Sequence, residues 1–199
     1  MKDTLNYLFA GNTLTKEEAR AILTRVGEGQ FSEAEIAALL TVFRMRKIKA
    51  EELSGFRQAM LDLSIAVDLS EFNAIDVVGT GGDGKNTFNI STLSCFVLAG
   101  AGYKVTKHGN YGLSSVSGAS NMFEYFGYKF SNNADKLRKE VEQAGICFLH
   151  APLFHPAMKH VGPVRKALKV KTLFNMMGPI INPSRPKNQL GSSRGRNSS

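Results

Sequence analysis

Two glycine-rich stretches combine small residues with hydrogen-bond donors in a pattern that suits an anion. The first, "GTGGDGKNTFNIST", spans residues 79–92 and runs from four glycines into Asn89, Ser91 and Thr92. Glycine lets a ligand approach backbone amides without a Cβ in the way, and the side chains that follow add donors. The stretch therefore predicts a phosphate-binding loop.

The second stretch, "KHGNYGLSSVSGAS", spans residues 107–120 and joins a cation, Lys107, to glycines and four serines. A lone loop of this kind is more often an ordinary turn, and neither stretch has the spacing of a Walker loop or of a GxGxxG fingerprint. Two such loops at one sheet edge favour a site that holds both ends of a polyphosphate, with Lys107 as a point charge.

The elements around both loops have the order of an α/β fold. After residue 70, the short apolar stretches "AIDVVGT", "YKVTKHG" and "ICFLH" alternate with the helical patterns "ISTLSCFVLAGAG", "SGASNMFEYFG" and "NADKLRKEVEQAG". This alternation is typical of a parallel sheet. Ligands of such sheets bind at the carboxyl ends of the strands, where helix N-termini attract anions, and both glycine-rich stretches follow a strand.

The chain before residue 70 has a helical period instead. Apolar residues recur there every three or four positions, and the pairs Thr15 with Glu18 and Ser32 with Glu35 have the spacing of capping boxes. We expect a bundle of three or four helices.

Composition narrows the class of protein. The 199 residues include 25 Lys and Arg against 17 Asp and Glu, and the net charge of +8 favours anionic partners. Only two cysteines occur, Cys95 and Cys147, which predicts a reducing compartment rather than a disulfide framework. The most apolar window is too short to span a membrane and no signal peptide is visible, so we expect a soluble, cytoplasmic protein without a membrane partner.

Other chemistry has weaker support in the sequence. Cys147 and His150 have a metal-ligand spacing, but residues three apart on a strand point to opposite faces, so we expect no zinc. A nucleic-acid-binding module is an alternative because residues 159–171 are basic. No stacking aromatics accompany that run, and we do not expect a nucleic-acid partner. The salt dependence of oligonucleotide binding would separate the two interpretations.

Four motifs together resemble the anthranilate phosphoribosyltransferase family of tryptophan biosynthesis: "GTGGDGKNTFNIST", "KHGN" with its run to "SGAS", "FHPAMKHVGPVR" and "FNMMGPIINPSRP". Their order and spacing match the family from the N-terminal helices to about Leu190. The resemblance implies transfer of a phosphoribosyl group from phosphoribosyl pyrophosphate (PRPP) to anthranilate, with Mg²⁺ and a homodimer. A pyrimidine nucleoside phosphorylase-like enzyme, which shares the architecture, is the alternative, and activity with pyrimidine nucleoside and phosphate would test it.

The resemblance also implies a set of site residues. The metal contact is Ser91, and no side chain is expected to act as a covalent nucleophile. The anthranilate residues are Gly79, Asn110, His108, His155 and Arg165. The PRPP residues are Gly79, Gly82, Asp83, Thr87, Asn89, Ile90, Ser91, Thr92, Lys107, His108, Gly109, Asn110, Gly112, Ser114, Ser115 and Ala119.

Residue by residue, the sequence also departs from the family. Tyr111 is unusual after "KHGN", and Ala119 stands where a serine is usual, so that one hydroxyl contact is missing. Family chains continue beyond residue 190 into further strands and an acidic pair that binds Mg²⁺. We therefore expect a C-terminally truncated, incomplete enzyme without the second metal site.

The predicted organisation has three parts. A helical bundle domain at residues 1–70 precedes a partial α/β domain for the phosphoribosyl donor at residues 71–190. The fold class is α/β, with a mainly parallel sheet that is incomplete at the C-terminus. Residues 191–199 contain no apolar side chain, and we expect them to be a disordered or non-native tail.

Overall fold

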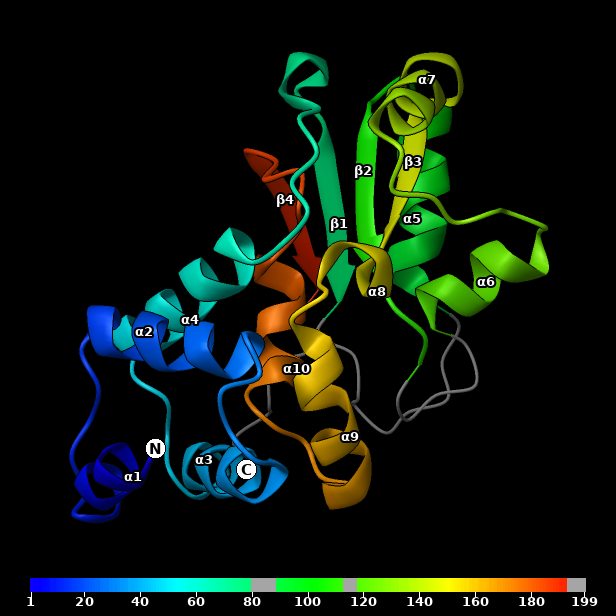
Figure 1. Ribbon diagram of the computed structural model, residues 1–199. Coiled ribbons are helices and arrows are strands. Elements are labelled where there is room, and N and C mark those ends of the chain that lie inside the picture. Colours follow the sequence, from blue (N-terminus) through cyan, green and yellow to red (C-terminus); the bar gives the residue numbers. More distant parts are fainter. Residues whose placement is uncertain (80–88, 113–117, 193–199) are drawn as a thin grey trace, which may run out of the picture. The chain divides into compact units, whose positions relative to one another are not determined.

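The computed structural model describes residues 1–79, 89–112 and 118–192 (Figure 1). The chain folds into two compact units, and each is built from two separate stretches of sequence. Unit 1 consists of Met1–Ile65 with His155–Ile181, and unit 2 consists of Ala66–Phe154 with Asn182–Ser199.

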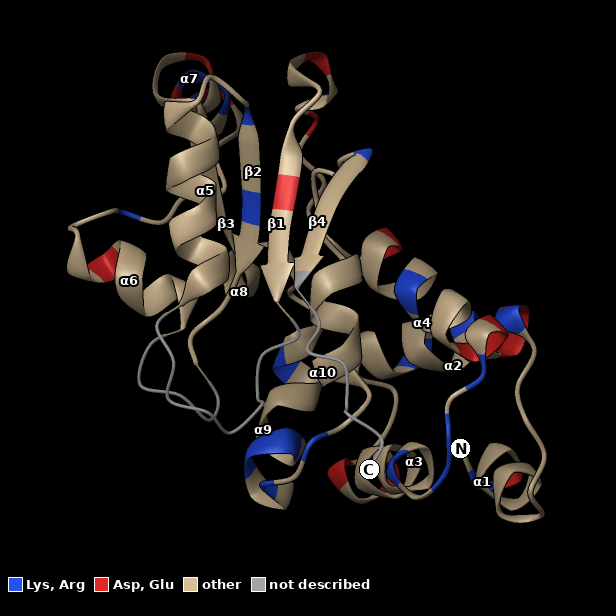
Figure 2. Cartoon of the chain, turned by 180° about the vertical axis from the view of Figure 1, so that it is seen from behind, with Lys and Arg blue, Asp and Glu red and all other residues tan. Residues whose placement is uncertain are grey.

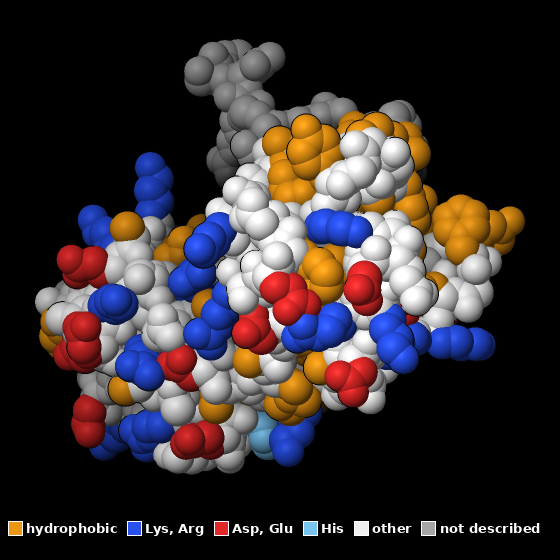
Figure 3. Space-filling view, turned by 90° about the horizontal axis from the view of Figure 1, so that it is seen from above, with side chains coloured by type: hydrophobic (Ala, Val, Ile, Leu, Met, Phe, Trp, Pro, Cys, Tyr) orange, Lys and Arg blue, Asp and Glu red, His pale blue; other side chains and the backbone are white. Residues whose placement is uncertain are grey.

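Charged residues lie mainly on helices and loops, and within the sheet a red band marks strand β1 (Ile75–Gly79) and blue marks strand β2 (Val105–Gly109) (Figure 2). Basic and acidic side chains are mixed over the face seen in Figure 3, and hydrophobic side chains gather toward one side of it. Within the described ranges, no helix is both long enough and apolar enough to cross a membrane.

Unit 1 is helical, and its local sequence signals form as predicted. The Thr15 hydroxyl accepts from the Glu18 amide at 3.2 Å, and the Glu18 carboxylate accepts from the Thr15 amide at 2.8 Å. Ser32 and Glu35 form the same capping box. The elements of this unit are α1 (Lys2–Phe9), α2 (Lys16–Gly27), α3 (Glu33–Met45), α4 (Ala50–Asp62), α9 (Met158–Leu168), α10 (Phe174–Met177) and the 3₁₀ turn η2 (Gly178–Ile180).

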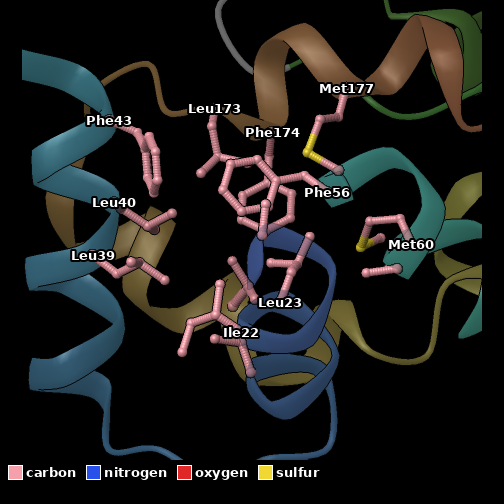
Figure 4. Packing of buried hydrophobic residues seen from close by; sticks show 14 of the residues in the cluster. Ile22, Leu23, Leu39, Leu40, Phe43, Phe56, Met60, Leu173, Phe174 and Met177 are labelled. Carbon is pink, nitrogen blue, oxygen red and sulfur yellow. The ribbon is translucent and has the colours of Figure 1, made fainter. Parts of the chain in front are cut away.

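The core of unit 1 joins the N-terminal helices to a distant segment (Figure 4). Leu173, Phe174 and Met177 pack in one cluster with the apolar faces of α2, α3 and α4, where the rings of Phe43 and Phe56 meet edge to face at 5.0 Å. The division predicted from sequence, at residue 70, placed residues 155–181 with the α/β domain. In the structure they belong to unit 1, because their apolar side chains complete its core.

Glu52 of α4 is fully buried in unit 1 and accepts hydrogen bonds from residues at the ends of α2, α3 and α4. Its carboxylate accepts from the Leu14 amide before α2, from the Lys49 amide at the start of α4, each at 2.9 Å, and from the Arg46 guanidinium after α3 at 2.8 Å. Burial raises the pKa of Glu52, but these donors outweigh it and the net pKa is lowered. The carboxylate is therefore held in its charged form.

Unit 2 contains a four-stranded sheet in the order β3-β2-β1-β4, and all of its strand pairs are parallel. This confirms the predicted class of a helical part followed by a parallel-sheet α/β part. The strands not yet given are β3 (Ile146–His150) and β4 (Asn188–Ser192). The helical elements are the 3₁₀ turn η1 (Ser70–Phe72), α5 (Ile90–Gly100), α6 (Ala119–Tyr125), α7 (Ala134–Ala144) and α8 (Ala151–Phe154).

Helices pack on both faces of this sheet. Val77 and Val105 form a cluster with Cys95 of α5, whereas Cys147 and Leu149 pack against α7. Because side chains alternate along a strand, His150 lies on the face opposite to Cys147, as the strand geometry predicts. Both cysteines are buried thiols.

The prediction of a tail that begins at residue 191 is wrong at its boundary. Strand β4 continues through Gly191 and Ser192, which pair with Val78 and Gly79 of β1. Backbone hydrogen bonding to β1 stabilises this polar stretch as a strand despite its composition, since pairing uses main-chain groups that every residue carries. Residues 193–199 lie outside the described part.

Candidate functional site

The start of helix α5 carries the strongest sign of a ligand site. Asn89 caps the helix, and its Oδ1 accepts from the Thr92 amide at 3.0 Å. Thr92 is fully buried, and its hydroxyl has no hydrogen-bond partner among the described residues. Buried hydroxyls are normally satisfied, and the amides of a helix N-terminus attract anions. A ligand oxygen at this turn would satisfy both requirements.

Gly79 ends strand β1, and Ile90 and Ser91 open helix α5. Parallel strands present their carboxyl ends at one edge of the sheet, so these residues share that edge. The predicted Gly82, Asp83 and Thr87 lie between them, outside the described residues.

Lys107 is buried inside the sheet rather than extended toward solvent. Only 3% of it is exposed, and its Nζ donates to the Val77 carbonyl at 2.8 Å. Its charge reaches helix α5. Burial raises the pKa of Cys95 in that helix to about 11, and the Lys107 ammonium opposes that rise. The structure therefore places a fixed positive charge beside α5, while the predicted direct contact with phosphate stays a prediction.

His108 follows this lysine in β2, and Asp76 lies in the neighbouring strand β1. Asp76 is fully buried, accepts from the His108 amide at 3.3 Å, and has its pKa raised mainly by burial. His108 is 7% exposed. A buried carboxylate beside a buried ammonium limits the cost of desolvating each charge.

In the second glycine-rich stretch, helix α6 and the residue before it contact residues 110–112, which follow strand β2. The Asn110 carbonyl accepts from the Ser120 amide at 3.2 Å, and the Asn121 side-chain oxygen accepts from Gly112 at 3.2 Å and from Gly118 at 3.1 Å. A Cβ on Gly118 would lie 2.0 Å from the Gly112 nitrogen, so glycine is required there. Both ends of the loop are thus fixed.

Ala119 and Gly109 bring α6 close to the end of β2. A Cβ added to Gly109 would lie 2.9 Å from the Ala119 Cβ and 3.1 Å from the Phe148 ring. The predicted PRPP residues Gly109 and Ala119 therefore pack closely against each other. The predicted Ser114 and Ser115 lie outside the described residues.

The remaining predicted residues, Arg165 and His155, belong to unit 1. The Arg165 guanidinium lies 5.5 Å from the Phe174 ring centre and donates to the Asn175 side-chain oxygen at 3.5 Å. No ion pair of the described residues includes it, and burial lowers its pKa. A half-buried cation without a carboxylate partner is suited to an anionic ligand.

His155 has a different environment. It is 3% exposed, it interacts with the backbone of Ile181 and Met60, and burial lowers its pKa to about 4. The imidazole is therefore neutral at physiological pH and is held by its own unit.

The start of α5 offers one side-chain ligand for a magnesium ion. Ser91 would supply one hydroxyl oxygen, and within the described residues no group of three His, Cys, Asp or Glu could hold a metal ion. Mg²⁺ commonly keeps several waters and binds proteins through few ligands together with substrate phosphates. Ser91 fits that mode of binding.

Two family models match the chain in sequence order. The helical bundle domain of a glycosyl transferase family matches residues 2–64, and its a/b domain matches residues 71–193. The chain belongs to this glycosyl transferase family. It is 61% identical to the anthranilate phosphoribosyltransferase of Christiangramia forsetii over 190 residues, which cover 96% of this chain and 57% of the relative.

Solved structures of anthranilate phosphoribosyltransferases are also similar to this glycosyl transferase chain. The anthranilate phosphoribosyltransferase of Thermus thermophilus matches with a TM-score of 0.89 and 34% identity, over 98% of this chain and 59% of that one. The enzyme of Saccharomyces cerevisiae in complex with PRPP and Mg matches with a TM-score of 0.86 and 31% identity, over 96% and 58%. The chain thus spans less than two thirds of the relatives it matches.

Sequence reasoning missed the residues that support the second loop. Asn121, Ser120 and His150 make the contacts that fix residues 110–112, yet none was predicted as a site residue. A polar residue at the end of the apolar strand "ICFLH" was the available signal, and it was considered only as a metal ligand.

Proposed function

We propose that the protein transfers the phosphoribosyl group of PRPP to anthranilate and releases pyrophosphate, with Mg²⁺ as cofactor. The similarity to the yeast enzyme, solved with PRPP and Mg, supports this over most of the chain. The observation that carries the proposal is the start of α5, where a buried hydroxyl on Thr92 lacks a partner within the described residues.

The donor would bind at the strand ends of unit 2. The first turn of α5 and the Thr92 hydroxyl offer donors to phosphate oxygens, and Lys107 adds a fixed positive charge close to α5. Ser91 would hold Mg²⁺ together with substrate phosphates and water. The remaining predicted PRPP residues belong to the same proposal.

The acceptor would be recognised by Arg165. A guanidinium offers paired donors and a planar face to an aromatic carboxylate. Asn175 and Phe174 position the group without neutralising it. We include Asn110, Gly79, His108 and His155 in the anthranilate set as proposed from the sequence.

The expected reaction is displacement at the ribose C1 with oxocarbenium-like character. Negative charge develops on the leaving pyrophosphate, and donors fixed before the reaction stabilise it without reorganising. When bound, Mg²⁺ supplies further neutralisation of that charge. The aromatic amine has a free lone pair, so positioning of the two substrates provides most of the catalysis. We propose a homodimer in the cytoplasm as the working form.

The test is the fluorescence of anthranilate on addition of PRPP and Mg²⁺ to this chain, with Arg165→Ala as the control variant. Loss of fluorescence that Arg165→Ala slows supports the reaction and the role of Arg165. Constant fluorescence together with no calorimetric binding of PRPP would refute the proposal.

A further inference from the structure

His150 is a buried polar residue that the proposed reaction does not use. It lies at the carboxyl end of β3, where 6% of it is exposed. Its Nδ1 lies 2.9 Å from the Ser120 hydroxyl, and its ring stacks on Phe130 with centroids 4.2 Å apart at an interplanar angle of 11°. The imidazole is therefore fixed by a hydrogen bond and by a ring contact at once.

Ser120 connects this imidazole to the second loop. The Ser120 hydroxyl contacts His150, while its backbone amide donates to the Asn110 carbonyl at 3.2 Å. The next residue, Asn121, accepts from the Gly112 amide at 3.2 Å. A shift of the first turn of α6 would consequently move the backbone of residues 110–112.

A second route from His150 reaches the same backbone. The Tyr111 ring meets the His150 imidazole edge to face, with centroids 5.2 Å apart at 81°. Tyr111 lies between Asn110 and Gly112, so both routes from His150 end on the same three residues.

Asn110 is the residue in this stretch that can contact a substrate. It is exposed, and its side-chain oxygen accepts from the Tyr111 amide at 2.8 Å. The hydrogen bond to Tyr111 orients the side-chain amide, and its nitrogen has no hydrogen bond to another described residue. The nitrogen is then available as a donor to a substrate oxygen, provided that the Tyr111 backbone keeps its place.

We propose that His150 is a positioning residue for the substrate site: through Ser120 and Tyr111 it holds residues 110–112 so that the Asn110 amide meets the phosphoribosyl donor. This inference rests on the proposed function, because the ligand of Asn110 is taken from it. His150 itself does not touch the substrate in this arrangement.

Three substitutions separate the hydrogen bond from the ring contact. His150→Phe keeps a ring against Phe130 and loses the nitrogen. His150→Asn loses the ring and retains a polar atom close to the place of Nδ1, and Ser120→Ala removes the other partner. The measurements are the calorimetric Kd for PRPP with Mg²⁺ and the melting temperature of each variant.

The expected result is a Kd for PRPP raised about fivefold in His150→Phe and in Ser120→Ala, the fold-change that corresponds to one lost hydrogen bond. The double variant should be no weaker than either single one, because both remove the same bond. His150→Asn should recover most of the affinity. Cys147→Ala, on the same strand but the opposite face, should lower the melting temperature and leave the Kd unchanged.

Two results would count against the proposal in different ways. If the unaltered chain binds PRPP and His150→Phe binds it equally well, the positioning role is refuted while the proposed function stands. If the unaltered chain does not bind PRPP at all, the donor site itself is refuted, and the role of His150 fails with it.

Discussion

Replacing Arg165 with Gln should weaken binding of the acceptor strongly while changing the stability of the protein little. Most buried charges in a folded protein are matched by an opposite charge, and Arg46 in unit 1 is an example, bound to the buried Glu52. Arg165 lacks such a partner among the described residues. The two arginines provide a matched comparison within one unit.

The expected magnitudes follow from these contacts. A 3.5 Å hydrogen bond to Asn175 and a cation–π contact with Phe174 stabilise Arg165 in the folded chain. Burial disfavours its charge and lowers its pKa. These effects oppose each other, so Arg165→Gln should change the free energy of unfolding by less than about 1 kcal/mol. Arg46→Gln leaves the Glu52 carboxylate buried without its cation, which costs about 3 kcal/mol. For a chain of this size that is a fall in melting temperature of about 6–12 °C.

The assay is thermal and urea unfolding of both variants, followed by circular dichroism, with anthranilate binding measured by fluorescence in parallel. Loss of the paired charge-assisted bonds should weaken anthranilate binding by roughly 10- to 100-fold in Arg165→Gln. Arg46→Gln should bind normally at temperatures where it is folded. If Arg165→Gln destabilises the protein as much as Arg46→Gln does, Arg165 is a structural residue and the reasoning is wrong.

Three further predictions concern single side chains. Thr92→Val removes a buried hydroxyl that has no partner in the described part, so the free energy of unfolding should rise by about 1 kcal/mol while the affinity for PRPP falls about fivefold; a loss of stability, measured by urea unfolding, would show that the hydroxyl is already satisfied. The pKa of His155 is lowered to about 4, so the unfolded chain binds a proton that the folded chain does not, and stability should fall by about 1.4 kcal/mol per pH unit from about pH 6.5 toward pH 4. That loss, followed by urea unfolding at several pH values, should be smaller in His155→Gln, and equal slopes would contradict the assignment. Gly118→Ala would bring a methyl group to 2.0 Å from the Gly112 nitrogen and should cost more than about 2 kcal/mol in urea unfolding, whereas Gly162→Ala, where no atom lies within 4 Å, should be neutral or stabilising.

Sequence patterns predicted the local parts of the fold well. Capping boxes such as that of Thr15 and Glu18 depend on residues three apart, and the alternation of strands and helices after residue 70 depends on short apolar runs. The packing of segment 155–181 with unit 1 was not predicted, because most of its packing partners lie about 100 residues or more away in the sequence. Its own pattern says only that it is helical.

In the candidate site, too, the local features could be predicted from the sequence and the long-range contacts could not. The glycine-rich loops were visible because their chemistry is contained in a few consecutive residues. The burial of Lys107 against Val77 could not be predicted, since it depends on which strands become neighbours in the sheet. The link from His150 to Ser120 likewise joins residues 30 positions apart. Contacts of this kind require the tertiary fold.

The interleaving of the two units constrains how the chain folds during synthesis. Unit 1 needs residues up to Ile181 to complete its core, and β4 of unit 2, which begins at Asn188, pairs with β1 more than 100 residues earlier. Contacts so distant in sequence raise the contact order and slow folding. As the ribosome releases the chain from the N-terminus, helices α1 to α4 emerge long before their core partners, with apolar surface exposed. Neither unit can finish folding before the other has been almost entirely translated.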